Sequence, residues 1–464
     1  MRKYFISVFI VPGLLLFSAG PLAANGNPYV PGQMVLKLWA GQEDQLDSIT
    51  NLYQATIVDS LAGVGCYLLQ APEGQDPESL SLEMEYETEV EYCDANYILA
   101  APEPVQSSQP FIDLQARGDF LTQPASTRLS LPTAQAINSG TGVSVGVIDV
   151  GVNLVHPALA GNVVSGFDFV SNDAVATDEP GGSASGHGTF IAGVIKLVAP
   201  SAEIKAYRVL DTTGNGDGFS IAEAVVRAVD EGCKVINLSM VMSGKHGSLD
   251  QALTYARDHN VMVVAAAGND STEVQRYPAS DSYVLSVAAL DSFDLKAGFS
   301  NYGSDISLAA PGTMVYAPFL DTLYAWWNGT SFAAPFVAGT AALVYASNPS
   351  ATWEMVRDAL RNTATSVDSI NPLYEGKLGT GMVNPLAAVQ SVTSSVCGDL
   401  DQNQIGPDLA DLTFLVDFLF FNGPACTNQM IARIDPGTGS PDISDLQYLI
   451  DYLFFAGSVP VCAP

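Results

Sequence analysis

A serine, a histidine and an aspartate that together could activate a nucleophile lie far apart in this 464-residue chain. Ser331 lies in the stretch "NGTSFAAPFVAG", where Gly-Thr-Ser precedes a run of small and apolar residues. A hydroxyl at a helix start can cap the helix, or it can attack a carbonyl once a base removes its proton. A histidine base in turn needs a carboxylate that orients it. Which role Ser331 has depends on whether the chain supplies both partners.

The best-placed base is His187, in "SGHGTFIAGVI", where small residues leave room around an imidazole at a helix start. The chain has three other histidines: His156, His246 and His259. Asp149 ends the apolar run "VSVGVID", and catalytic groups of parallel sheets lie at the carboxyl ends of strands. Each residue alone could be a cap, a core histidine or a strand-end carboxylate, but together they predict a nucleophilic triad.

The elements that must position these groups alternate between strands and helices from residue 140 onward. Short runs rich in Val, Ile and Ala are "GVSVGVID", "AEIKAYRVL", "KVINLSM", "VMVVAAAG" and "YVLSVAAL". Helical patterns lie between some of them, as in "SIAEAVVRAVDEG" and "SLDQALTYARDHN". Nearly continuous apolar strands joined by helices predict an α/β domain with a parallel sheet covered on both faces.

The motifs resemble those of the subtilisin-like serine peptidases, the subtilases, over residues 134–392. The resemblance rests on "VIDVGVNLVHP", "GHGTFIAG" and "GTSFAAPFVAG", and on "FSNYG" and "APG" before the serine. It implies an acyl-enzyme mechanism with Asp149, His187 and Ser331, and no cofactor for catalysis. "AAAGNDS" resembles the oxyanion segment and implies that Asn269 is a donor. Val150 departs from the family, which usually has Thr or Ser there, so a hydroxyl that supports the aspartate is lost.

The same resemblance implies a substrate cleft in which the peptide lies as an extra strand. Its expected residues are Gly214, Asn215, Gly216, Ser239, Met240, Val241, Ala266, Ala267 and Gly268. The last three should form the far wall of the pocket for the residue before the cut. Val241 stands where the family usually has glycine, so its branched Cβ should narrow the entrance to this pocket.

The N-terminal part divides into three expected segments. Residues 1–24 combine Arg2 and Lys3 with an apolar run and small residues near Ala23, the pattern of a signal peptide. Residues 29–100 alternate between strand and helix patterns, which predicts a small α+β unit, and residues 101–133 have the composition of a linker. The α+β unit resembles the inhibitory prodomain of fervidolysin-like subtilases. The alternative is an unrelated α+β binding domain.

The tail, residues 397–464, contains a duplication: "DLTFLVDFLFF" and "DLQYLIDYLFF" each follow an Asp- and Gly-containing loop. It resembles a small helical dockerin, which implies calcium and a cohesin-like or cell-surface partner. Candidate ligands in the first loop are Asp399, Asp401, Asn403, Asp408 and Asp411, at a spacing one residue too long. The second loop keeps only Asp442 and Asp445 in register. A two-helix module held by apolar packing and a Cys397–Cys426 or Cys426–Cys462 bond is the alternative.

Composition narrows the class of protein. Apolar residues make up 48% of the chain, enough for large cores, and the net charge is −31. Such acidity argues against binding to nucleic acid and against a basic membrane-surface protein. An oxidising compartment would permit a Cys66–Cys93 bond, whereas Cys233 in "EGCKVINLSM" has the setting of a buried small hydrophobe.

The sequence thus favours a secreted serine endopeptidase made as a self-processing zymogen. Its partners would be protein or peptide substrates and its own prodomain as inhibitor. The alternative is a catalytically inert subtilase-fold protein that acts through its tail in binding or assembly.

Overall fold

The structure is a computed structural model, and it describes residues 28–105, 108–114, 120–242, 244–273, 276–392, 409–421 and 443–455. The expected signal peptide lies outside the described residues. So do four of the five candidate ligands in the first tail loop, Asp442 in the second, and the tail cysteines.

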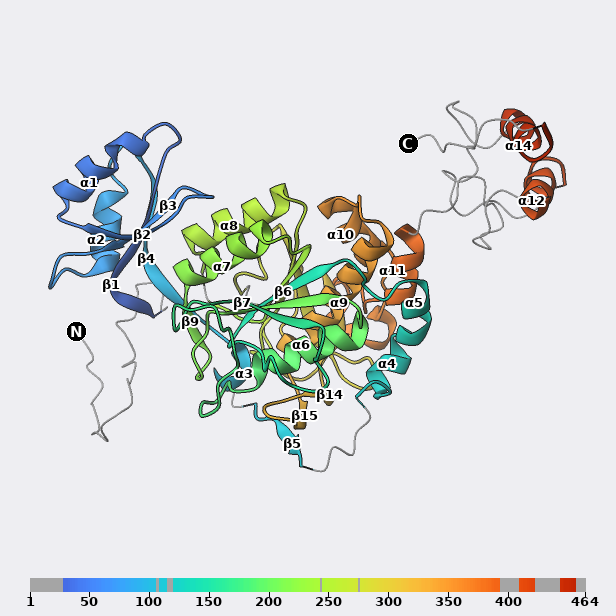
Figure 1. Ribbon diagram of the computed structural model, residues 1–464, viewed down its shortest axis with the longest axis horizontal. Helices are drawn as coiled ribbons and strands as arrows, with labels where there is room; N and C mark the ends of the chain where they lie inside the picture. Colours follow the sequence, from blue (N-terminus) through green and yellow to red (C-terminus); the bar gives the residue numbers. More distant parts are fainter. Residues whose placement is uncertain are drawn as a thin grey trace.

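A seven-stranded sheet, which includes β6 and β7, forms the middle of the molecule (Figure 1). Its strand order is β13-β12-β11-β10-β6-β8-β7. All neighbouring strands run parallel. The strands are β6 (Ser144–Asp149), β7 (Val163–Asp168), β8 (Glu203–Arg208), β10 (Val235–Leu238), β11 (Met262–Ala266), β12 (Val284–Leu290) and β13 (Leu308–Pro311). Five of them are the apolar runs of the sequence, while β7 and β13 are additional. The predicted α/β fold with a parallel sheet is confirmed.

Helices cover both faces of this sheet because alternate side chains of each strand point to opposite sides. Val145 and Val147 of β6 join the core beneath α6 and α9, whereas Ile148 joins the core beneath α7 and α8. The helices are α6 (His187–Val198), α7 (Gly218–Asp230), α8 (Gly247–Asp258), α9 (Thr330–Ser347), α10 (Trp353–Asn362) and α11 (Pro385–Val392). Among the described residues only α9 is long and apolar enough to cross a membrane, and 89% of it is buried in the protein core.

Residues 29–100 form an antiparallel sheet in the order β2-β3-β1-β4 with two helices on one face. The elements are β1 (Tyr29–Leu38), a 3-10 turn (Glu43–Gln45), α1 (Leu46–Leu52), β2 (Thr56–Leu61), β3 (Cys66–Gln70), α2 (Pro77–Met84) and β4 (Val90–Ala100). Along β1, Met34 and Leu36 pack against these helices, while Val35 faces the other way and joins the core of α7 and α8. The α+β unit therefore packs its open sheet face on the larger domain.

Strand β4 also supplies polar groups to the first turns of two helices in the larger domain. The Asp94 carboxylate accepts a bond from the Gly247 amide at the start of α8, with an N–O distance of 3.2 Å. Asn96 accepts from the Phe219 amide of α7 at 3.1 Å and donates to Asp217 at 2.9 Å. Helix starts leave amides without helical partners, so these contacts bind the unit to α7 and α8.

The Cys66–Cys93 bond that an oxidising compartment would permit is not present. Strand β1 lies between the two strands that carry these cysteines, because Lys37 pairs with Cys66 and the neighbouring Leu36 pairs with Cys93. Strands two positions apart are separated by about 9–10 Å, beyond the reach of a disulfide. Both thiols are free and buried. Cys233 is buried as expected, and burial raises its pKa to about 12.

The segment expected to be a linker, 101–133, contains ordered elements. They are α3 (Pro102–Val105), β5 (Phe111–Asp113), α4 (Pro124–Arg128) and the start of α5 (Leu131–Ile137). β5 completes a small antiparallel sheet with β14 (Val315–Pro318) and β15 (Tyr324–Trp327). The segment is therefore part of the folded domain, and its first turn reaches the site described below.

The remaining elements complete the chain. Two short turns, Asp368–Ile370 and Pro372–Tyr374, lie between α10 and α11, and β9 (Asn215–Asp217) precedes α7. In the tail, α12 (Leu409–Phe420) and α14 (Ile443–Phe455) pack together around buried Leu415 and Leu449. The two predicted tail helices are thus present.

Candidate active site

Asp149 is the last residue of β6, so it lies where the carboxyl ends of the parallel strands meet, as the sequence predicts. Its Oδ1 contacts Nδ1 of His187 at 2.8 Å and accepts a bond from the Val150 amide at 2.8 Å. Its Oδ2 is buried and has no hydrogen-bond partner among the described residues. Val150 has no hydroxyl to offer, so the departure from the family coincides with an unpaired carboxylate oxygen.

His187 is the first residue of α6, and a tight turn at Gly186, with φ of +89°, delivers it there. Asp178 fixes this helix start: its carboxylate accepts from the Gly186 amide at 2.9 Å and from the Thr189 hydroxyl at 2.6 Å. The Trp327 ring lies 5.8 Å from the imidazole, centroid to centroid. The imidazole is fully buried.

Ser331 lies in the first turn of α9, and Asn269 follows the end of β11. The orientation of the Asn269 amide is fixed because its Oδ1 accepts from the Thr330 amide at 3.0 Å and from the Thr330 hydroxyl at 2.9 Å. Its Nδ2 therefore donates on the other side, to the carboxylate described next. Thr330 also accepts from the Gly268 amide at 3.1 Å, which connects the two segments.

A fourth side chain, Glu103 of α3, lies at the centre of these groups and is fully buried. Its Oε2 accepts from the Ser331 hydroxyl at 2.7 Å and contacts His187 Nε2 at 3.1 Å. Its Oε1 accepts from Asn269 Nδ2 at 2.8 Å and from the Ser331 amide at 3.4 Å. Ser331, His187 and Asn269 thus converge on one carboxylate.

Electrostatics at this centre favour a charged imidazole. Burial alone would lower the pKa of His187, but the carboxylates of Asp149 and Glu103 outweigh it and raise that pKa to about 10. Each ring nitrogen then donates a bond, Nδ1 to Asp149 and Nε2 to Glu103. Burial raises the pKa of Asp178 to about 7, and the nearby Asp149 charge adds to the effect.

The end of the chain's own strand β4 lies between the segments that were expected to bind substrate. Ile98, Leu99 and Ala100 pair antiparallel with residues 215–217, so β9 becomes the fifth strand of the N-terminal sheet. On the same side the Ala101 amide donates to the Gly214 carbonyl at 2.9 Å, and on the opposite side Ala100 exchanges two main-chain bonds with Val241, at 3.1 and 2.8 Å. The segment 98–101 is therefore an extra strand between 214–217 and 241.

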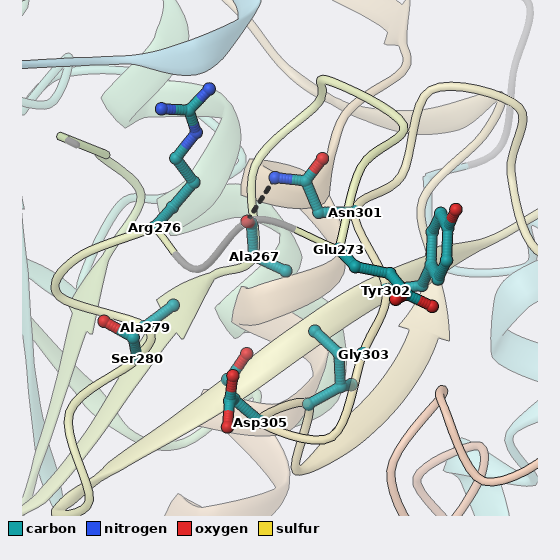
Figure 2. Close-up of a pocket in the computed structure, with 11 residues that line it drawn as sticks. Ala267, Glu273, Arg276, Ala279, Ser280, Asn301, Tyr302, Gly303 and Asp305 are labelled. Carbon is teal, nitrogen blue, oxygen red and sulfur yellow. Dashed lines mark hydrogen bonds between the residues drawn. The ribbon is translucent and has the colours of Figure 1, made fainter.

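Of the other expected substrate residues, Ser239 contacts the serine directly. Ser239 donates to the Ser331 carbonyl at 3.0 Å, and Met240 is fully buried. Ala266 ends β11, directly before Ala267 and Gly268. Ala267 lines a small pocket with residues of the 273–280 and 301–306 loops, and Figure 2 shows Asn301 donating to the Ala267 carbonyl.

Four groups at this site were not identified in the sequence. Glu103 lies in the expected linker, three residues after the predicted strand "VEYCDANYILA", and nothing in the sequence marked it. Asp178 does not lie in any of the motifs quoted above. Asn301 lies in "FSNYG" and holds the oxyanion segment through Ala267 and the Asp270 amide, at 2.9 Å each. Thr330 lies beside the serine in its motif.

Within the described residues no cluster of His, Cys, Asp or Glu could hold a metal ion.

Comparisons with known proteins agree with this geometry. The Subtilase family model matches residues 140–384. Thermitase of Thermoactinomyces vulgaris is 39% identical over 273 residues, which cover 57% of this chain and 94% of thermitase. Subtilisin Savinase of Lederbergia lenta is 40% identical over 261 residues, 54% of this chain and 92% of Savinase. A crystal structure of fervidolysin from Fervidobacterium pennivorans, a keratinolytic enzyme related to subtilisin, is 25% identical with a TM-score of 0.64. That match covers 80% of this chain and 62% of the fervidolysin chain.

Proposed function

The chain belongs to the subtilase family of serine endopeptidases, and we propose that it is a secreted member made as a self-processing zymogen. Catalysis in this family needs no cofactor. The proposed reaction is the hydrolysis of peptide bonds in proteins or peptides through an acyl-enzyme on Ser331. Secretion rests on the signal-peptide pattern of residues 1–24.

In the proposed mechanism, neutral His187 takes the Ser331 proton as the hydroxyl oxygen attacks a peptide carbonyl. Asp149 holds the imidazole in the tautomer that leaves Nε2 free to accept, and it stabilises the charge that forms. Asn269 Nδ2 and the Ser331 amide donate to the oxyanion. His187 then gives the proton to the leaving amine, and water releases the acyl group by the same steps.

One observation carries this proposal. The Ser331 hydroxyl and His187 Nε2 both contact a single oxygen of Glu103, while Asn269 Nδ2 and the Ser331 amide both point at the other. A nucleophile, a base and two oxyanion donors thus face the space of one carboxyl group, which is the size of a reacting carbonyl. The inert binding protein considered from the sequence is not retained, because the family's members are serine endopeptidases.

We further propose that residues 29–100 act as an inhibitory prodomain. Support comes from the strand at 98–101, which lies where the resemblance expects a substrate, and from the contacts of Asp94 and Asn96 with α8 and α7. Main-chain pairing of this kind would exclude an extended peptide from the same edge.

The tail is proposed to be a dockerin-like module with a cohesin-like or cell-surface partner. The packed pair α12 and α14 supports the module. Asp411 and Asp445 lie at corresponding positions in the first turns of these helices and are both buried. Carboxylates suit Ca²⁺, so Asp411 would complete a site with Asp399, Asp401, Asn403 and Asp408.

Replacing Ser331 by alanine in the full chain tests the function. The variant should lose proteolysis by on the order of 10⁶ and remain as uncut precursor. Ser171→Ala, at an exposed serine, is the matched control and should process normally. A Ser331→Ala protein that is cut at the parent rate when purified alone would refute self-processing, and one that still digests peptides would refute the serine mechanism.

A further inference from the structure

Glu103 makes more contacts with the groups of the site than its place in an expected linker requires. Both carboxylate oxygens receive two contacts each, all from groups assigned above to the serine mechanism, and the side chain is fully buried. The fit is close, since a Cβ on Gly329 would overlap this carboxylate. A buried carboxylate is costly unless donors surround it, so this arrangement stabilises the anion.

The path of the chain explains how a side chain comes to occupy this place. β4 enters the cleft as a substrate-like strand up to Ala101, and the backbone then turns into the short helix α3. Beyond it, the Ser108 hydroxyl donates to the Asn328 carbonyl at 2.9 Å, and β5 pairs with β15. The chain crosses the cleft from one side to the other, but at the serine a carboxylate replaces the main-chain carbonyl.

We propose that Glu103 is a built-in carboxylate ligand of the catalytic centre, which holds the uncut chain inactive by occupying the position of the reaction's oxyanion. The proposal rests on the serine mechanism above. The carboxylate fills the oxyanion site through Asn269 and the Ser331 amide, and it accepts a hydrogen bond from the hydroxyl of the nucleophile.

The same carboxylate also disables the base. Burial lowers the pKa of His187, but Asp149 and Glu103 together raise it to about 10, so at neutral pH the imidazole carries its second proton and cannot take another. Self-cleavage therefore requires the α3 turn to withdraw Glu103 before a peptide carbonyl can reach Ser331. Glu103 acts as an inhibitor of the first cut, separately from the strand pairing of β4.

The test uses the full chain and a fluorophosphonate probe, with short exposures at pH 7.5 and the uncut and processed bands read separately. The variants are Glu103→Gln, which keeps the volume and removes the charge, and Glu103→Asp, which keeps the charge and shortens the reach. Glu73→Gln, at an exposed glutamate of the N-terminal unit, is the matched control. Processed bands should label equally in all four proteins, which shows that the peptidase domain is folded.

Uncut Glu103→Gln should label about 10- to 100-fold faster than the uncut parent, the range expected when one charge-assisted hydrogen bond is lost. Uncut Glu103→Asp should fall between the two, and Glu73→Gln should match the parent. Equal rates for the uncut parent and both Glu103 variants, with processed bands that label normally, would overturn the proposal alone. If no band of any protein reacts, the serine mechanism and this proposal both fail.

Discussion

The uncut chain should react at Ser331 faster as the pH rises toward 10, and replacing Glu103 by glutamine should move this dependence to lower pH. The reason lies in the general base. His187 contacts Asp149 at 2.8 Å on one nitrogen and Glu103 at 3.1 Å on the other, and its pKa is raised to about 10. Only the neutral imidazole can accept the serine proton, so the rate follows the neutral fraction.

The magnitude follows from that value. At pH 7.5 a group with a pKa of about 10 is neutral in roughly 1 molecule in 300. Asp149 is the larger cause of the raised pKa and stays in the variant, so Glu103→Gln should increase this fraction without reaching the roughly 90% of an ordinary histidine with a pKa near 6.5. The raised pKa of His187 also makes the stability of the folded chain depend on pH. Because the pKa is raised above its unfolded value, the contribution of the charged contacts to folding is complete below about pH 6.5 and is lost as pH rises through about 10.

The assay is the rate of fluorophosphonate labelling of the uncut band from pH 5.5 to 10.5 at fixed ionic strength, with Ser331→Ala as the blank. The charged and titrating groups around His187 are Asp149, Glu103 and, through Asp149, Asp178. Burial raises the pKa of Asp178 to about 7, inside the pH range of the assay, so the informative quantity is the difference between the two profiles. Identical profiles with a common bend below pH 8 would show that Glu103 does not control the base.

Three further outcomes are expected. Val150→Thr should place a hydroxyl near the unpaired Asp149 Oδ2 and raise kcat of the processed enzyme by about 2- to 10-fold, the worth of one hydrogen bond; an unchanged or lower kcat would contradict this. Val241→Gly should raise kcat/KM for peptides with Phe before the cut more than for those with Ala, and the bias should be graded because pocket size is worth only about 1–3 kcal/mol; equal increases would show that Val241 does not narrow the pocket. A chain ending at residue 395 should keep its peptidase activity, and calorimetry should detect at most one Ca²⁺ site fewer in it than in the full chain; a loss of two tight sites would make the interpretation of the second tail loop wrong.

The sequence was most informative where the signal is local. The five apolar runs and the patterns of α7 and α8 have the periods of strand and helix, so they could be read directly. β7 was missed because "VVSGFD" is half exposed and contains Gly166, and β13 because it has four residues and ends in Pro311. The local composition of β7 and β13 does not distinguish these short edge strands from loops.

Features that depend on distant pairing could not be read. The separation of Cys66 from Cys93 follows from the strand order β3-β1-β4, which no local pattern contains. The position of Glu103 depends on pairing between residues 98–101 and segments more than a hundred residues away, and the prolines around it are typical of a linker. Asp149, His187 and Ser331 could be identified because each has a local setting that suits its role, at a strand end or among small residues at a helix start, and because these settings also resemble the motifs of a known family.

Strand β9 would lose its neighbouring strand if the N-terminal unit, residues 29–100, were removed. In the uncut chain it is the last strand of a five-stranded sheet, paired through β4. Removing residues 29–100 would leave it as an open sheet edge, the kind of surface on which chains associate and aggregate. β9 has only three residues, Asn215–Asp217, and very short edges are one way in which proteins avoid this hazard. The processed enzyme would thus keep an edge long enough to hold one extended peptide and too short to recruit a neighbouring molecule.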